Sequence, residues 1–281
     1  MSAPQEITRL GIIAGGGALP AYLLDVCKNK GITVYIAALE GQCNANVADE
    51  HPADKVLWSA LGSAGRIIDF FKNNDVSDLV LIGSVRRPTF SEIKPDLKTI
   101  KILSRIGLQT LGDNGVLSAL KTELGKDGFC VHAIQDFCDK LLMPRGVLGD
   151  FNFFPEDKRT IDFGILKSQE LGAEDIGQAV VVQNETLIAC EDKFGTDALI
   201  KRSESLIDSS NVCSAILVKT CKPQQDTALD LPTIGVNTVQ NAYEAGINGI
   251  VVQAGYTLLV DPKNIAEYAN KYKMFVLGVD I

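Results

Sequence analysis

The sequence contains few of the residues that most often perform acid–base chemistry or bind transition metals. It has only two histidines, His51 and His132, and its seven cysteines form no C-x-x-C pair. Neither histidine lies close to a cysteine pair, so we expect both to be structural and do not expect a zinc site. An odd cysteine count without such pairs is typical of reduced thiols in a cytosolic protein.

Long apolar runs and an excess of positive charge are also missing. No apolar stretch approaches the roughly 20 residues that cross a bilayer, and residues 1–6 are polar, so we expect no signal peptide. These features favour a cytoplasmic protein without a transmembrane segment. The net charge of −8 argues against binding to nucleic acid. A local cluster of lysines or backbone amides can nevertheless hold one phosphate-bearing small molecule.

The first half of the chain alternates short apolar runs with amphipathic stretches. Hydrophobic residues make up 46% of the 281 residues, which is enough for two domains with cores of their own. We predict strands over residues 10–14, 32–38, 55–58, 78–82 and 129–133, and helices over 19–29, 62–73 and from 113 or 114 to 124. Strands that alternate with helices indicate a parallel, Rossmann-like sheet covered on both faces.

The second half is predicted to be a separate, mixed α/β domain. Glycine and proline are frequent between residues 143 and 162, so we place domains at 1–145 and 163–281, joined by a linker at 146–162. Residues 179–183 and 186–190 read as a hairpin, and residues 249–253 and 257–260 as a further strand pair. Helices are expected over 161–171, 196–207, 238–245 and 262–272, and strands over 214–219 and 274–277.

A glycine run follows the first predicted strand and precedes a helix. Gly15, Gly16 and Gly17 could direct backbone N–H groups at a phosphate near the positive end of that helix. In the dinucleotide fingerprint G-x-G-x-x-G, the third glycine packs the helix closely against the strand. Pro20 occupies that place here. Nucleotide binding, NAD binding and a plain tight turn all stay open at this point.

Two further motifs combine charge with a strand end. Arg86 and Arg87 follow the strand at 78–82 and could grip a phosphate, or they could belong to a solvated loop. Gly195-Thr196-Asp197 opens a helix four residues after Glu191. The two acids could share a metal ion, but an ordinary helix cap explains the same residues.

The loop from Lys219 to Gly235 mixes lysines with acids between a strand and a helix. Lys219 and Lys222 could neutralise phosphate charge, while Asp230 could hold Mg²⁺ or orient water. That combination suits phosphoryl transfer. A polar loop that only caps the following helix, with Thr238 as the cap, accounts for the same residues equally well.

Several of these motifs occur together in an order typical of one family. They are A-G-G-G-A-L-P at 14–20, G-D at 112–113, D-I-G-Q at 175–178, G-T-D-A at 195–198, K-P at 222–223 and D-L-P-T-I-G at 230–235. The ordered set resembles the LpxI-type UDP-2,3-diacylglucosamine pyrophosphatases of lipid A biosynthesis, nearly from end to end.

The resemblance implies a reaction and a set of site residues. The family hydrolyses UDP-2,3-diacylglucosamine to lipid X and UMP with Mg²⁺. Asp230 matches the residue needed for turnover, and Lys219 matches the first lysine of a K-x-x-K-P stretch. Asp230 and Asp197 are the expected metal ligands. The expected substrate contacts are Ala14, Gly15, Gly16, Gly17, Leu19, Pro20, Arg87, Gly195, Thr196, Asp197, Lys222 and Pro232.

The resemblance also implies partners. A homodimer is expected, and peripheral contact with the inner membrane would deliver the lipid to an apolar cleft in the C-terminal domain. Two other functions compete with hydrolysis: an NAD(P)-dependent oxidoreductase, and a regulatory module that binds UDP-sugars without turnover. Pro20 in the third glycine place and the scarcity of histidine disfavour the oxidoreductase.

Overall fold

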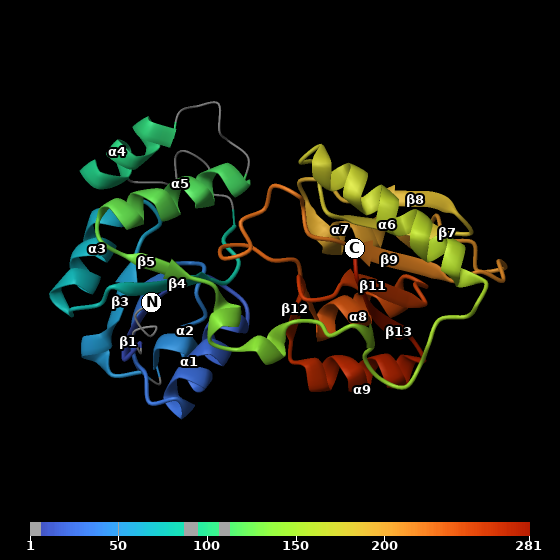
Figure 1. Cartoon of the computed structure of the whole chain (residues 1–281), viewed down its shortest axis with the longest axis horizontal. Coiled ribbons are helices and arrows are strands. Elements are labelled where there is room, and N and C mark those ends of the chain that lie inside the picture. The colour runs from blue at the N-terminus through green and yellow to red at the C-terminus, as the bar shows by residue number, and fades with distance from the viewer. Residues whose placement is uncertain (1–6, 50, 87–94, 107–112) are drawn as a thin grey trace, which may run out of the picture. The chain divides into compact units, whose positions relative to one another are not determined.

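The computed structural model describes residues 7–49, 51–86, 95–106 and 113–281. The chain forms two compact units, residues 1–139 and residues 140–281 (Figure 1). Among the described residues, no helix has both the length and the apolar character needed to cross a membrane.

The first unit is built on a five-stranded parallel sheet with the order β3-β2-β1-β4-β5. Its strands are β1 (Arg9–Ala14), β2 (Thr33–Leu39), β3 (Val56–Ser59), β4 (Asp78–Ile82) and β5 (Cys130–His132). Parallel strands need crossover connections, and helices supply them here. The helices are α1 (Leu19–Asn29), α2 (Ala45–Asp49), α3 (Ala64–Asn73), α4 (Leu97–Ile106) and α5 (Asp113–Lys126).

Helices cover both faces of this sheet. Phe71 of α3 and Leu124 of α5 pack in one core cluster with Ala37 and Leu39 of β2. Side chains alternate along a strand, so Val34 and Ile36 face the opposite side, where α1 lies (Figure 1). Burial on both faces explains why these strands read as apolar runs.

The second unit contains a six-stranded mixed sheet with the order β6-β13-β11-β9-β7-β8. Three neighbouring internal strands, β9 (Ala215–Lys219), β11 (Gly249–Gln253) and β13 (Phe275–Val279), are parallel. The others, β6 (Gly146–Val147), β7 (Ala179–Gln183) and β8 (Thr186–Cys190), join antiparallel. The predicted α/β class, with a Rossmann-like parallel sheet followed by a mixed sheet, is confirmed.

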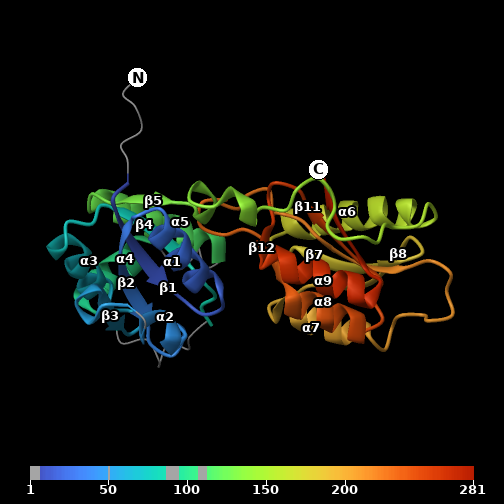
Figure 2. The same ribbon diagram turned by 90° about the horizontal axis from the view of Figure 1, so that it is seen from below.

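The helices of the second unit form two layers around its sheet. Helix α6 (Asp157–Ala173) covers one face, where Ile161 packs on Val180 and Val218. Helices α7 (Gly195–Ser203), α8 (Val236–Glu244) and α9 (Pro262–Tyr272) cover the other, as Figure 2 shows. Because β9, β11 and β13 are parallel, their carboxyl ends lie at the same edge of the sheet, between the two helix layers. Sheets of this kind bind ligands at that edge.

Two details of the second unit differ from the sequence analysis. Residues 249–253 and 257–260 are not paired, because β11 lies between β9 and β13. Strand β12 (Leu258–Val260) pairs instead with β10 (Thr233–Gly235) in a separate two-stranded parallel sheet. Residues 146–162 contain β6 and the start of α6, both within the second unit.

Close packing of β11 on β13 predicts a stability effect at Gly249. A methyl group at this position would overlap the buried ring of Phe275, which also packs edge-on against Phe153. We expect Gly249→Ala to lower the free energy of unfolding by about 1–3 kcal/mol, because the core cannot absorb the added volume. Differential scanning calorimetry should show an earlier transition.

The matched control is Gly172→Ala in α6, where an added methyl group meets its nearest atoms at an ordinary distance of 3.6 Å. This variant should be neutral or slightly more stable, since alanine favours helix. Equal transition temperatures for both variants would contradict the packing argument.

Candidate active site

Lys219 is the last residue of β9, at the carboxyl edge of the second sheet. Its side chain is buried, with 7% of the residue exposed. Its ammonium group donates to Thr196 Oγ1 at 3.0 Å and to the Thr233 carbonyl oxygen at 3.4 Å. Within residues 140–281, all of which are described, no carboxylate forms an ion pair with it. A buried cation held only by neutral oxygens favours the binding of an anion.

Thr196 links this ammonium group to a buried acid. Its hydroxyl lies 2.5 Å from Glu191 Oε1 and also accepts from Lys219, so the hydroxyl proton points to the carboxylate. The other oxygen of Glu191 accepts from the Gln178 backbone N–H at 2.8 Å. A side chain at Gly177 would collide with the Glu191 backbone. Glu191 therefore anchors Thr196, and Thr196 positions Lys219.

Asp230 lies on the loop that follows β9 and is half-buried. Its Oδ2 accepts from Gln225 Nε2 at 2.6 Å, and the Oε1 of this amide accepts from the Lys222 backbone N–H at 3.2 Å. Gln225 is itself buried. Within residues 140–281, no lysine or arginine pairs with Asp230, so its charge is not neutralised there.

Cys221 lies on the same loop as Asp230, and the pKa of its thiol is raised. Burial, followed by the negative charge of Asp230, raises the pKa of the Cys221 thiol to about 11. Its backbone N–H donates to Gln253 Oε1 at the end of β11. The loop after β9 is thus fixed to the neighbouring strand.

The remaining predicted residues of this unit have other partners. Lys222 forms an ion pair with Asp175 at 2.8 Å, and Asp197 is exposed and accepts from Asn241 Nδ2 at 3.4 Å. The buried Pro232 accepts from the Leu258 backbone N–H, where β10 and β12 meet. Gly195 begins α7 with a φ of +81°, a conformation that glycine adopts readily. Within residues 140–281, Asp197 and Asp230 share no hydrogen-bond partner.

The glycine turn of the first unit approaches a second loop closely. Gly16 and Ser84 exchange two backbone hydrogen bonds, of 2.7 and 3.0 Å. A side chain at Gly15 would meet the Ser84 carbonyl oxygen at 2.5 Å, and Gly17 has a φ of +88°. The three glycines therefore let the turn pass over the end of β4. Ala14 ends β1, while Leu19 and the buried Pro20 begin α1.

Only part of the arginine pair can be placed. The Arg86 backbone N–H donates to Gln42 Oε1 at 2.8 Å. Arg87 lies outside the described residues, so its predicted substrate contact stays a prediction.

Comparison with known proteins covers both units. Residues 9–141 match the model of the LpxI N-terminal domain, and residues 144–277 match that of the LpxI C-terminal domain. The UDP-2,3-diacylglucosamine pyrophosphatase LpxI of Caulobacter vibrioides is 35% identical over 277 residues, which span 97% of this chain and 98% of the relative. The chain belongs to the LpxI family.

In this LpxI family member, the fold brings together only some of the residues that the sequence singled out. Thr196 and Lys219 are in contact, although they are 23 residues apart. Three supporting groups were not predicted from the sequence: the Gln178 backbone N–H, the Gln225 side-chain amide and the Thr233 carbonyl group. A glutamine gives no sequence signal for such a role, but Gln178 and Thr233 do fall within the D-I-G-Q and D-L-P-T-I-G motifs.

A cavity of about 340 Å³ lies between α6 and the β6–β13 edge of this unit. Its apolar lining comes from Phe153, Ile161, Ile165, Leu277 and Val279. Arg145 and Lys158 also line it, beside Asp162 and Asp280. Arg145 pairs with Asp280 and Lys158 pairs with Asp162, so the charges of the lining are balanced and its apolar wall is the part that suits an acyl chain.

The raised pKa of Cys221 gives a test of where Asp230 lies. The thiolate is the reactive form, so Cys221 should react slowly with iodoacetamide near pH 8. Asp230→Asn removes the negative charge of Asp230, which contributes less than burial to the raised pKa of Cys221. The substitution should therefore lower the pKa of this thiol and raise its thiolate fraction. We expect faster alkylation of Cys221, by up to about tenfold, since one pKa unit changes that fraction tenfold.

The exposed Cys190 supplies the internal reference for this measurement. Peptide mass spectrometry should find its alkylation rate unchanged by Asp230→Asn. An unchanged rate at Cys221 would place the Asp230 carboxylate away from the thiol.

Proposed function

We propose that the chain hydrolyses UDP-2,3-diacylglucosamine to UMP and lipid X, 2,3-diacylglucosamine 1-phosphate, in lipid A biosynthesis. Membership of the LpxI family and the name of the Caulobacter relative support the substrate. The observation that carries the assignment is Lys219. A buried ammonium group without a carboxylate partner in its unit, at the ligand-binding edge of a sheet, suits a pyrophosphate.

Lys219 would bind the pyrophosphate and balance the charge that grows on its oxygens. Its position is fixed in advance by Thr196 and the Thr233 carbonyl group, so little reorganisation is needed when the substrate arrives. Preorganised charge of this kind is the main protein contribution to phosphoryl transfer. Gly195 and Asp197 border Thr196 at the start of α7 and would contact the same part of the substrate.

Asp230 would act on the attacking water. Hydrolysis forms a bond from the water oxygen to one phosphorus and breaks the bridging P–O bond, while one water proton leaves. Gln225 donates to one carboxylate oxygen of Asp230, and no cation of its unit pairs with this carboxylate, so the other oxygen can accept a hydrogen bond from the attacking water. Lys222 and Pro232 flank the loop and would contact the substrate.

We propose Mg²⁺ as the metal ion of this reaction. This ion prefers carboxylate oxygens and usually takes one or two of them together with substrate phosphates. Asp230, with Asp197 as the second acid, would hold the ion. When bound, Mg²⁺ polarises the phosphoryl oxygens and promotes deprotonation of water.

The first unit would bind the uridine nucleotide. The turn formed by Ala14, Gly15, Gly16 and Gly17 leads into α1 through Leu19 and Pro20, and its backbone can approach a ligand closely. Arg87 is a further expected contact. The acyl chains would occupy an apolar cleft of the second unit, for which the cavity beside α6 is the candidate. A cytoplasmic location, peripheral membrane contact and a homodimer stay predictions.

An assay of UMP and lipid X release tests both the reaction and Asp230. Purified protein should convert UDP-2,3-diacylglucosamine with Mg²⁺ present and stop when EDTA is added. Asp230→Asn should lower kcat by at least roughly 100-fold, a loss typical of removing a group that acts in the transition state.

Asp226→Asn is the matched control on the same loop. Its side chain accepts from the Ala228 backbone N–H, and an asparagine oxygen can do the same, so turnover should be nearly unchanged. If the folded wild-type protein leaves the substrate intact with Mg²⁺ present, the proposed reaction is wrong. Normal turnover by Asp230→Asn would remove Asp230 from it.

A further inference from the structure

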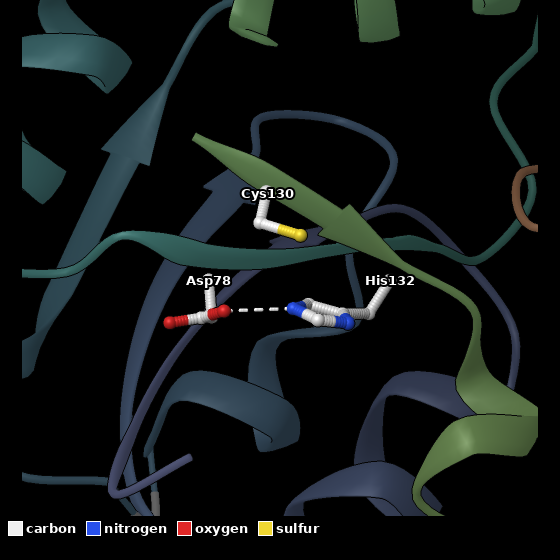
Figure 3. A group of neighbouring side chains, drawn as sticks. All are labelled: Asp78, Cys130 and His132. Carbon is white, nitrogen blue, oxygen red and sulfur yellow. Dashed lines mark hydrogen bonds and ion pairs between the residues drawn. The ribbon is translucent and has the colours of Figure 1, made fainter. Parts of the chain in front are cut away.

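A second group of ligating side chains lies in the first unit, at the opposite edge of its sheet from the glycine turn. Asp78 begins β4, and Cys130 and His132 belong to β5. Their Oδ, Sγ and imidazole N atoms all lie within 4.8 Å of one another. Figure 3 shows the three side chains turned toward a common point.

The backbone register explains why these residues meet. Strands β4 and β5 are parallel, with Asp78 opposite Cys130 and Val80 opposite His132. Side chains two residues apart share a face, so Cys130 and His132 lie on the same face as Asp78. The grouping therefore follows from the strand pairing and not from adjustable loops.

Neighbouring groups orient two of the three side chains. Ser77 Oγ donates to Asp78 Oδ2 at 2.7 Å and leaves Oδ1 directed at His132 Nε2, also at 2.7 Å. The other imidazole nitrogen lies 4.0 Å from the Asp136 carboxylate. Phe137 contacts the ring edge-on. The distance to Asp136 is too long for a hydrogen bond, and Asp136 Oδ2 accepts instead from the Ala133 backbone N–H.

We propose that Asp78, Cys130 and His132 bind a borderline-soft divalent cation of the Zn²⁺ class. Sulfur, imidazole nitrogen and carboxylate oxygen are the three ligand types that Zn²⁺ takes, whereas Mg²⁺ avoids sulfur. Zn²⁺ bonds of about 2.1 Å at a tetrahedral angle hold ligand atoms roughly 3.4 Å apart. The Asp78 and His132 atoms, 2.7 Å apart, are closer than that, so metal binding would open their hydrogen bond. Water or an external ligand would take the fourth position.

This site is separate from the proposed Mg²⁺ site in ligand chemistry and in position along the chain. Binding would tie the start of β4 to β5, which is the last strand of the sheet. The proposal differs from the expectation that His132 is structural. That expectation considered cysteine pairs and overlooked the alternation Cys130-Val131-His132 along one strand.

Protection of Cys130 from alkylation tests the proposal without an activity assay. We would treat the untagged full-length protein with iodoacetamide, with and without one equivalent of Zn²⁺, and map the modified cysteines by mass spectrometry. We expect Zn²⁺ to slow modification of Cys130 at least tenfold. Cys190 is the matched reference, because it is also exposed and also lies on an edge strand, β8.

Asp78→Asn separates metal binding from general effects, since it leaves Cys130 in place and retains a side chain that can bond to His132. It should remove most of the protection. Titration with Co²⁺ should give a cobalt–thiolate absorption band that Cys130→Ser abolishes and Cys190→Ser preserves. Equal modification of Cys130 with and without Zn²⁺, or equal slowing at Cys130 and Cys190, would overturn the proposal.

Discussion

The candidate active site depends on one buried charge that is held by neutral groups. Lys219 ends a central strand, with a hydroxyl and a carbonyl oxygen as its partners. A direct ion pair to Glu191 would neutralise the ammonium group and leave little attraction for a phosphate. Thr196 stands between the two charges, so that Glu191 stabilises the arrangement while the cation keeps its affinity for an anion.

The arrangement of the sheet explains why this charge is in place before substrate binds. Lys219, Gln253 and Val279 end three neighbouring parallel strands, and the Cys221 backbone N–H donates to the Gln253 side chain. The loop after β9 therefore starts from a rigid edge. Gln225, buried within that loop, orients Asp230 from behind. Rigid strands thus position the cation, and a braced loop positions the acid.

Much of the fold could be predicted from sequence because its signals are local. Helices α1 and α9, strand β4 and the hairpin β7–β8 were predicted with the bounds observed. The hairpin turns at Asn184 and Glu185, which both have positive φ. Pairing depends on distant segments, which explains the error at β11 and β12. Helix α4 was missed altogether.

The site was harder to predict than the fold. Motifs identified Thr196, Lys219 and Asp230, but only the folded chain shows that Thr196 separates Lys219 from Glu191. Gln225 and the Asp78–Cys130–His132 group carry no motif, because their roles arise from strand register and loop closure. Ordered motifs thus indicate the chemistry, while long-range packing determines which side chains can take part.

Substrate binding without turnover tests the central role of Lys219 most directly. In the Asp230→Asn background, we would measure the affinity for UDP-2,3-diacylglucosamine in detergent micelles, then add Lys219→Met or the exposed control Lys201→Met. We expect at least tenfold weaker binding, about 1.4 kcal/mol, with Lys219→Met and little change with Lys201→Met, because Lys201 is exposed. Equal affinity in all three proteins would contradict this role of Lys219.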